Sequence, residues 1–120
     1  LQQKLQGKAY VYGTLTSPVT AKEAGVVAKT VKLLHPTSKI LAIDAGVGDK
    51  NDVGLIKLRD YGLKPGLGVN KTLPIIGDAS IIGIVSEKQN ALENLFSSTR
   101  LGLIYKMSTT IANGIEYSLK

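Results

Sequence analysis

The succession of strand-like and helix-like segments in the first 45 residues constrains the fold most. Residues 9–15 (AYVYGTL) are rich in strand-forming side chains. Residues 20–34 carry apolar side chains at spacings of three and four, which predicts a helix. Thr20 and Glu23 stand at capping-box spacing at its start, and a His-Pro pair follows its end. Residues 39–45 (KILAIDA) predict a second strand, so the three segments predict a right-handed βαβ unit.

The rest of the chain adds further elements of both kinds. In chain order they are a glycine-rich turn over 45–52, an edge strand over 53–60, a long loop over 62–78, a buried strand over 79–85, a short helix over 90–97 and a final helix over 99–117. Hydrophobic residues make up 43% of the chain and aromatic residues only 5%, which favours a parallel sheet built from aliphatic side chains. The sequence therefore predicts one α/β domain over residues 1–120, a three-layer α/β/α sandwich with a mostly parallel sheet.

Composition excludes several classes of function. The absence of cysteine excludes disulfides, thiolate zinc sites and a cysteine nucleophile. No apolar run approaches the roughly 18 residues that a membrane span requires, and we expect no membrane partner. The net charge is +6, but the basic residues are spread along the chain, so no nucleic-acid partner is expected. The first residues are typical of a helix end closed by Gly7, which suggests a chain truncated at its N-terminus.

Asp44 is the strongest candidate for a chemical role. An apolar strand-forming run ends in this single carboxylate, and small residues follow it. Open α/β sheets bind ligands at the carboxyl ends of their strands. A carboxyl group beside apolar β structure also tends to have a raised pKa, which suits acid/base catalysis near neutral pH. The alternative is that Asp44 caps the following turn.

Known motifs are mostly absent. Residues 62–78 resemble a phosphate loop, but Asn70 rather than glycine precedes Lys71, and the dinucleotide fingerprint fails as well. Residues 45–52 lack the ligand spacing of an EF-hand. The single histidine, His35, lies at a predicted helix end, where a capping or surface role is expected. No cofactor is therefore expected. The polar side chains left at strand ends and in the long loop are Asp44, Asp49, Asp52, Lys71 and Asp78.

The segment PGLGVNKTLPIIGD (65–78), with YGTL before it and STRLGLIYKM after it, resembles a known family. The chain is similar from about residue 9 to residue 112 to the YyaC-type sporulation proteins of endospore-forming Firmicutes. These are relatives of the spore germination protease and more distantly share the fold of hydrogenase-maturation endopeptidases. The resemblance implies a phosphorylase/hydrolase-like fold. It also implies a peptidase that acts on a protein or peptide of the spore, in the cytoplasm of the forespore or mother cell.

The resemblance assigns roles to individual residues. Asp44 matches one of two aspartates of an aspartic-type catalytic pair. Asn70, Lys71 and Asp78 match the family's loop motif, and Arg100 matches a helix-entry motif that braces this loop. We expect these four residues to contact the substrate or the loop.

The family's second aspartate has no counterpart here. It lies in a Gly-Thr-Asp motif after the family's first strand, and both are missing from these 120 residues. Paired carboxylates hydrolyse amides because one keeps a proton while the other loses it. The chain alone therefore cannot assemble the pair, and a homo-oligomer would be one compensation. Two alternatives to an aspartic peptidase are a non-catalytic binding or assembly module on the same fold and a nickel-dependent endopeptidase, for which His35 is poorly placed.

Overall fold

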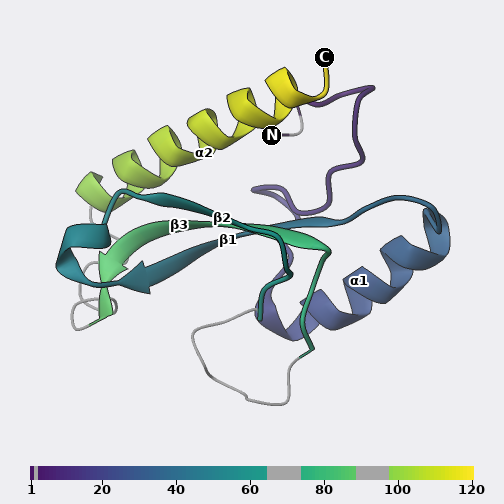
Figure 1. Ribbon diagram of the computed structural model, residues 1–120, viewed down its shortest axis with the longest axis horizontal. Helices are drawn as coiled ribbons and strands as arrows, with labels where there is room; N and C mark the ends of the chain where they lie inside the picture. The colour runs from purple at the N-terminus through teal and green to yellow at the C-terminus, as the bar shows by residue number, and fades with distance from the viewer. Residues whose placement is uncertain (2, 65–73, 89–97) are drawn as a thin grey trace.

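The structure is a computed structural model that describes residue 1 and residues 3–64, 74–88 and 98–120 (Figure 1). In chain order its elements are α1 (Ala21–Leu34), β1 (Leu41–Gly48), the 3₁₀ helix η1 (Lys50–Asp52), β2 (Ile56–Arg59), β3 (Ala79–Glu87) and α2 (Ser98–Ser118). Over the described residues the chain is an α/β domain with two α-helices and one three-stranded sheet. The prediction of an α/β fold is confirmed.

The sheet has the strand order β1-β3-β2, so β3 is its central strand. β3 pairs with β1 in parallel and with β2 in antiparallel. Its residues are buried or half-buried on both faces, which is typical of a strand in a sheet that is covered on both sides. Within the described residues the sheet is thus mixed, whereas the sequence predicted a mostly parallel one. The predicted edge strand over 53–60 is confirmed, because β2 lies at an edge and contributes antiparallel pairing.

The core lies between β3 and α2. Met107 and Ile111 of α2 are buried, as are Ile81 and Val85 of β3. Gly83 permits the close approach, since a Cβ atom built on it would lie 2.9 Å from Cε of Met107. The predicted final helix is confirmed. Because side chains alternate along a strand, the even-numbered residues of β3 face away from α2.

Helix α1 forms where the sequence predicted it. Thr20 is its N-cap residue, and the Thr20 hydroxyl donates a hydrogen bond of 3.0 Å to Oε1 of Glu23. The helix ends at Leu34, and the N–H of the capping residue His35 donates to the carbonyl of Val31. Figure 1 shows α2 above the sheet and α1 below it, beside the start of β1.

The predicted strand over 9–15 is wrong, and so is the βαβ unit built on it. These residues have no regular secondary structure, and the side chains of Tyr10 and Leu15 are exposed. A strand needs a partner for its backbone hydrogen bonds, and the described residues place none beside this segment. Helix α1 therefore leads into β1 without a preceding strand.

Strand β1 begins two residues later than predicted and continues to Gly48, through part of the predicted glycine-rich turn. Gly46 makes the continuation possible, because a Cβ atom there would lie 2.8 Å from Cγ2 of Ile82.

The long loop over 62–78 is described only at its ends, where Leu63 and Ile76 exchange backbone hydrogen bonds of 2.9 and 2.7 Å. The predicted helix over 90–97 lies entirely outside the described residues. No helix in the described part of the chain has the length and apolarity needed to cross a membrane.

Candidate functional site

A cavity of about 270 Å³ lies on the face of the sheet away from α2. Ile82 and Ile84 of β3 form its apolar floor. Asp44 lines it from β1, and Lys57 and Arg59 line it from β2. Lys64, shortly after β2, adds a third cation. The cavity therefore combines one carboxylate with three basic side chains.

The strand register explains how these groups meet. Asp44 pairs with Ile82 across the parallel ladder, and Ile82 pairs with Lys57 across the antiparallel ladder. The three residues thus form one row across the sheet. Neighbouring strands lie about 4.8 Å apart, so the backbones of β1 and β2 are separated by roughly 10 Å. The carboxylate and the cations stand on opposite walls of the cavity.

Asp44 lies in the middle of β1 rather than at its C-terminal tip, where the sequence placed it. Its side chain is exposed overall, and its Oδ1 accepts a hydrogen bond of 2.8 Å from the N–H of Ala45. Burial of the carboxyl group against neighbouring atoms raises the pKa of Asp44, and the bond from Ala45 opposes that increase in part. The carboxyl group both lines the cavity and accepts from the N–H of the next residue. No turn begins here, because β1 continues to Gly48, so the predicted turn cap is wrong and the chemical role stays a prediction.

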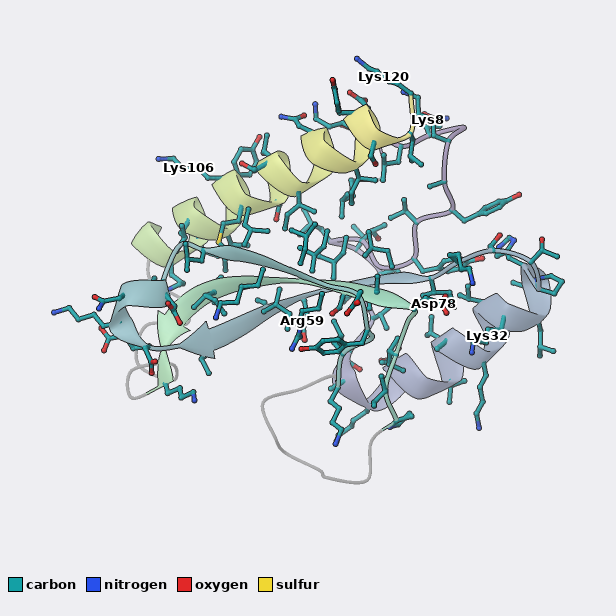
Figure 2. The ribbon with its side chains drawn as sticks, in the orientation of Figure 1. Lys8, Lys32, Arg59, Asp78, Lys106 and Lys120 are labelled. Atoms are coloured by element: carbon teal, nitrogen blue, oxygen red, sulfur yellow. The ribbon has the colours of Figure 1, made fainter. Side chains whose placement is uncertain are left out.

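The basic side chains differ in their partners. Nζ of Lys57 lies 3.4 Å from Oδ2 of Asp52, and both side chains are partly exposed. The guanidinium of Arg59 stacks over the ring of Tyr61, with 5.1 Å between Cζ and the ring centroid. Its Nε is buried and has no hydrogen-bond partner among the described residues. Figure 2 shows Arg59 on the side of the sheet away from α2.

Asp78 lies where β1 and β3 begin, away from this cavity (Figure 2). Its Oδ2 accepts a hydrogen bond of 2.8 Å from the N–H of Ile40, and its own N–H donates to the carbonyl of Ile40 at 2.8 Å. This reciprocal pair fixes the entry of the chain into β1. Arg100 is half-buried in the first turn of α2 and does not line the cavity. The predicted site residues Asn70 and Lys71 lie outside the described residues.

Sequence reasoning missed the three basic residues that line the cavity. Lys57 and Arg59 are separated by one residue in the strand IKLR, so alternation puts both on one face. That signal was present in the predicted edge strand. What the sequence did not show is that β3 aligns this face with Asp44.

His35 occupies a separate place at the end of α1. Its ring stacks on Tyr10 with centroids 3.9 Å apart, and its Nε2 lies 2.8 Å from the hydroxyl of Tyr12. The predicted capping role is confirmed. The described residues contain no group of three or more histidine, aspartate or glutamate side chains that could hold a metal ion.

Comparison with known proteins places the chain among relatives of unknown function. A family model described as "Protein of unknown function (DUF1256)" matches residues 1–114. The chain is 36% identical over 116 residues to "Uncharacterized protein YyaC" of Bacillus subtilis (strain 168). The match covers 97% of this chain and 57% of that relative, so the chain spans little more than half the relative's length. No solved structure matches significantly. The predicted resemblance to YyaC is confirmed, and the more distant likeness to the germination protease stays a prediction.

Proposed function

We propose that this chain, which belongs to the DUF1256 family, is the part of a peptidase that carries an acid/base aspartate, Asp44. One observation carries the proposal: the carboxyl group of Asp44 lines a cavity, and burial raises its pKa. A carboxyl group whose pKa moves toward neutral exchanges protons more effectively at working pH.

The chemistry follows from these properties. As a carboxylate, Asp44 takes a proton from a water molecule that attacks the carbonyl carbon of a peptide bond. It then returns that proton to the nitrogen of the leaving amine. The apolar floor formed by Ile82 and Ile84 lowers the polarity on one side of the carboxyl group, which strengthens electrostatic interactions there. In the aspartic-type pair implied by the resemblance, a second carboxylate shares this task.

The resemblance also suggests to which fold group the domain belongs, which substrates to assay and in which compartment to look for them. We assign the domain to the three-layer, phosphorylase/hydrolase-like sandwiches of the germination protease group. Small proteins of the spore are then the first substrates to assay. The forespore and mother-cell cytoplasm are the compartments in which to look for them.

The test compares the unmodified protein with Asp44→Asn in cleavage of purified spore proteins, followed by mass spectrometry of the products. Asp44→Asn keeps the shape of the side chain and a carbonyl oxygen that can accept from Ala45, but it cannot exchange a proton. We expect loss of cleavage by about 100-fold or more, the usual scale of general acid–base catalysis. Asp60→Asn serves as the control, because Asp60 is exposed and does not line the cavity. Equal cleavage by wild type and Asp44→Asn would rule out the catalytic role.

A second candidate is a non-catalytic binding module on the same fold. The observation in its favour is that Asp44 is the single carboxylate lining the cavity among the described residues, where three cations accompany it. Paralogues of enzymes often lose chemistry and keep binding. Calorimetric titration of spore-protein fragments that shows binding with no turnover would favour this candidate over a peptidase.

A further inference from the structure

We propose that Lys57, Arg59 and Lys64 form a subsite that binds a carboxylate group of the peptide ligand, opposite Asp44. The choice of a peptide rests on the proposed function, whereas the choice of a carboxylate rests on the cavity itself. That carboxylate is either the C-terminus of the peptide or an acidic side chain, because both offer the same two oxygen atoms.

The balance of charge in the cavity supports an anionic ligand. Asp52 satisfies part of the charge of Lys57, and it lies outside the cavity lining. No described carboxylate pairs with Arg59 or Lys64. The three cations exceed the one lining carboxylate, so the cavity favours a ligand that brings negative charge.

Arg59 provides the most specific feature of the subsite. Its Nε is buried and has no hydrogen-bond partner within the described residues, and no described carboxylate pairs with the guanidinium, so a protein anion does not already occupy this cation. Stacking on Tyr61 holds the guanidinium plane in place. A fixed guanidinium binds the two oxygens of a carboxylate with geometric selectivity that an ammonium lacks.

The width of the sheet sets the position of the carboxylate in the ligand. The cations lie across roughly 10 Å of sheet from Asp44. An extended peptide advances about 3.3 Å per residue. A carboxylate two or three residues from the peptide bond at Asp44 therefore reaches the subsite.

A peptide carboxylate fits better than a nucleic-acid phosphate. Asp44 on the facing wall repels a polyanion that extends across the cavity. The two isoleucines of the floor suit aliphatic peptide side chains. The cavity lining contains no aromatic residue among those described, so it offers no surface on which a base would stack.

The test measures binding in the full chain carrying Asp44→Asn, so that no ligand is cleaved. Three peptides of equal length are titrated by NMR or calorimetry. One has a glutamine and an amidated C-terminus, one replaces the glutamine with glutamate, and one keeps the glutamine but has a free C-terminus. We expect at least one carboxylate-bearing peptide to bind roughly tenfold tighter than the neutral peptide, the scale of a hydrogen bond to a charged group. Which peptide gains affinity identifies the source of the carboxylate.

Variants then assign the effect to the subsite. Lys64→Gln should remove most of the preference with little risk to folding, since Lys64 is exposed. Arg59→Lys keeps the charge but removes the planar donor group, and it should reduce the preference as well. Lys106→Gln is the matched control, because Lys106 is exposed on α2, far from Arg59 (Figure 2). It should leave the preference unchanged.

A single-stranded oligonucleotide is titrated in the same way as a control. Three outcomes would overturn the inference: equal or absent binding of all three peptides, a preference that survives Lys64→Gln and Arg59→Lys together, or tighter binding of the oligonucleotide than of every peptide. None of these outcomes bears on the peptidase proposal, which the cleavage assay tests separately. Conversely, a carboxylate preference of the Asp44→Asn protein, together with no cleavage by the wild-type protein, would support the subsite and rule out the catalytic role of Asp44.

Discussion

Asp44 shows how one residue can combine a local bond with a place in a cavity. Its Oδ1 accepts from the next N–H in the chain, while the same carboxyl group faces the apolar floor between β1 and β2. Burial penalises the charged form, which raises the pKa of Asp44 from its ordinary value of 3.8. The folded protein therefore binds a proton at this group at pH values where the unfolded chain has lost it.

This pKa shift has a consequence for stability. Below pH 3.8 Asp44 is largely protonated in both states and has no effect. As the pH rises through the raised pKa of the folded state, the folded protein must accommodate a charge that the unfolded chain carries more easily. Stability is therefore lost with rising pH. We expect Asp44→Asn to be more stable than wild type at pH 7 and equally stable near pH 3.5, measured by urea unfolding. A stabilisation of the same size at both pH values would contradict this account, and Asp60→Asn provides the comparison for a carboxylate outside the cavity.

The resemblance predicts a substrate or loop role for Asp78, whereas its hydrogen bonds predict a role in stability. Its carboxylate accepts from the N–H of Ile40 at the start of β1. We expect Asp78→Ala to lower the free energy of unfolding by about 1–3 kcal/mol, the scale for a hydrogen bond to a charged group. Asp78→Asn should cost less because the amide oxygen can still accept. If chemical denaturation shows Asp78→Ala to be as stable as wild type, the bond to Ile40 is not structural.

At the level of elements, the bridge between Leu63 and Ile76 holds the two described ends of the long loop together. Gly62 lies directly before this bridge. A Cβ atom on Gly62 would collide with the backbone carbonyl oxygens of Ile76 and Gly77, which cannot move without breaking the bridge. The bridge also fixes Leu63 and thereby the position of Lys64 beside the cavity.

We therefore expect Gly62→Ala to destabilise the protein by about 1–3 kcal/mol, as overpacking does elsewhere. Gly102→Ala is the matched control, because Gly102 lies in α2 with open space around it. That change should stabilise the protein by about 0.5–1 kcal/mol through higher helix propensity. Thermal unfolding of the two variants measures both effects. Similar shifts in the two variants would show that the contacts at Gly62 relax at little cost.

Across the whole molecule, burial is concentrated on one pair of elements. Most of the buried hydrophobic side chains belong to β3 and α2, whereas Ala24 alone is buried in α1 among the described residues. Local stability follows the density of buried apolar contacts. The two helices should therefore differ in how often they open.

Hydrogen–deuterium exchange tests this difference. We expect the amides of β3 and of the middle of α2, around Met107, to exchange most slowly. The amides of α1 should exchange faster, although α1 is a regular α-helix of 14 residues. Uniform protection across both helices would indicate instead that α1 opens only in global unfolding.

Local patterns predicted the helices and the central strand because their causes are local. The spacing of apolar residues in 20–34, with Thr20 before it and a proline after it, fixed both ends of α1 to within a residue. The apolar run over 79–85 likewise predicted β3, whereas the approach of Met107 to Gly83 is seen only in the structure. Residues 9–15 have similar strand propensity but form no strand. Propensity cannot supply the neighbouring strand that backbone pairing requires.

The candidate site shows the same division. The sequence alone singled out Asp44, since an acid within an apolar strand is conspicuous without any knowledge of its neighbours. Only the tertiary structure decided which groups face that acid, because Lys57 and Arg59 reach the cavity through a register that β3 imposes on both of its neighbours. Periodicity and capping act between residues a few positions apart, so they can be read from the sequence without knowledge of the tertiary structure. Charge complementarity across a sheet exists only after strands distant in sequence have paired.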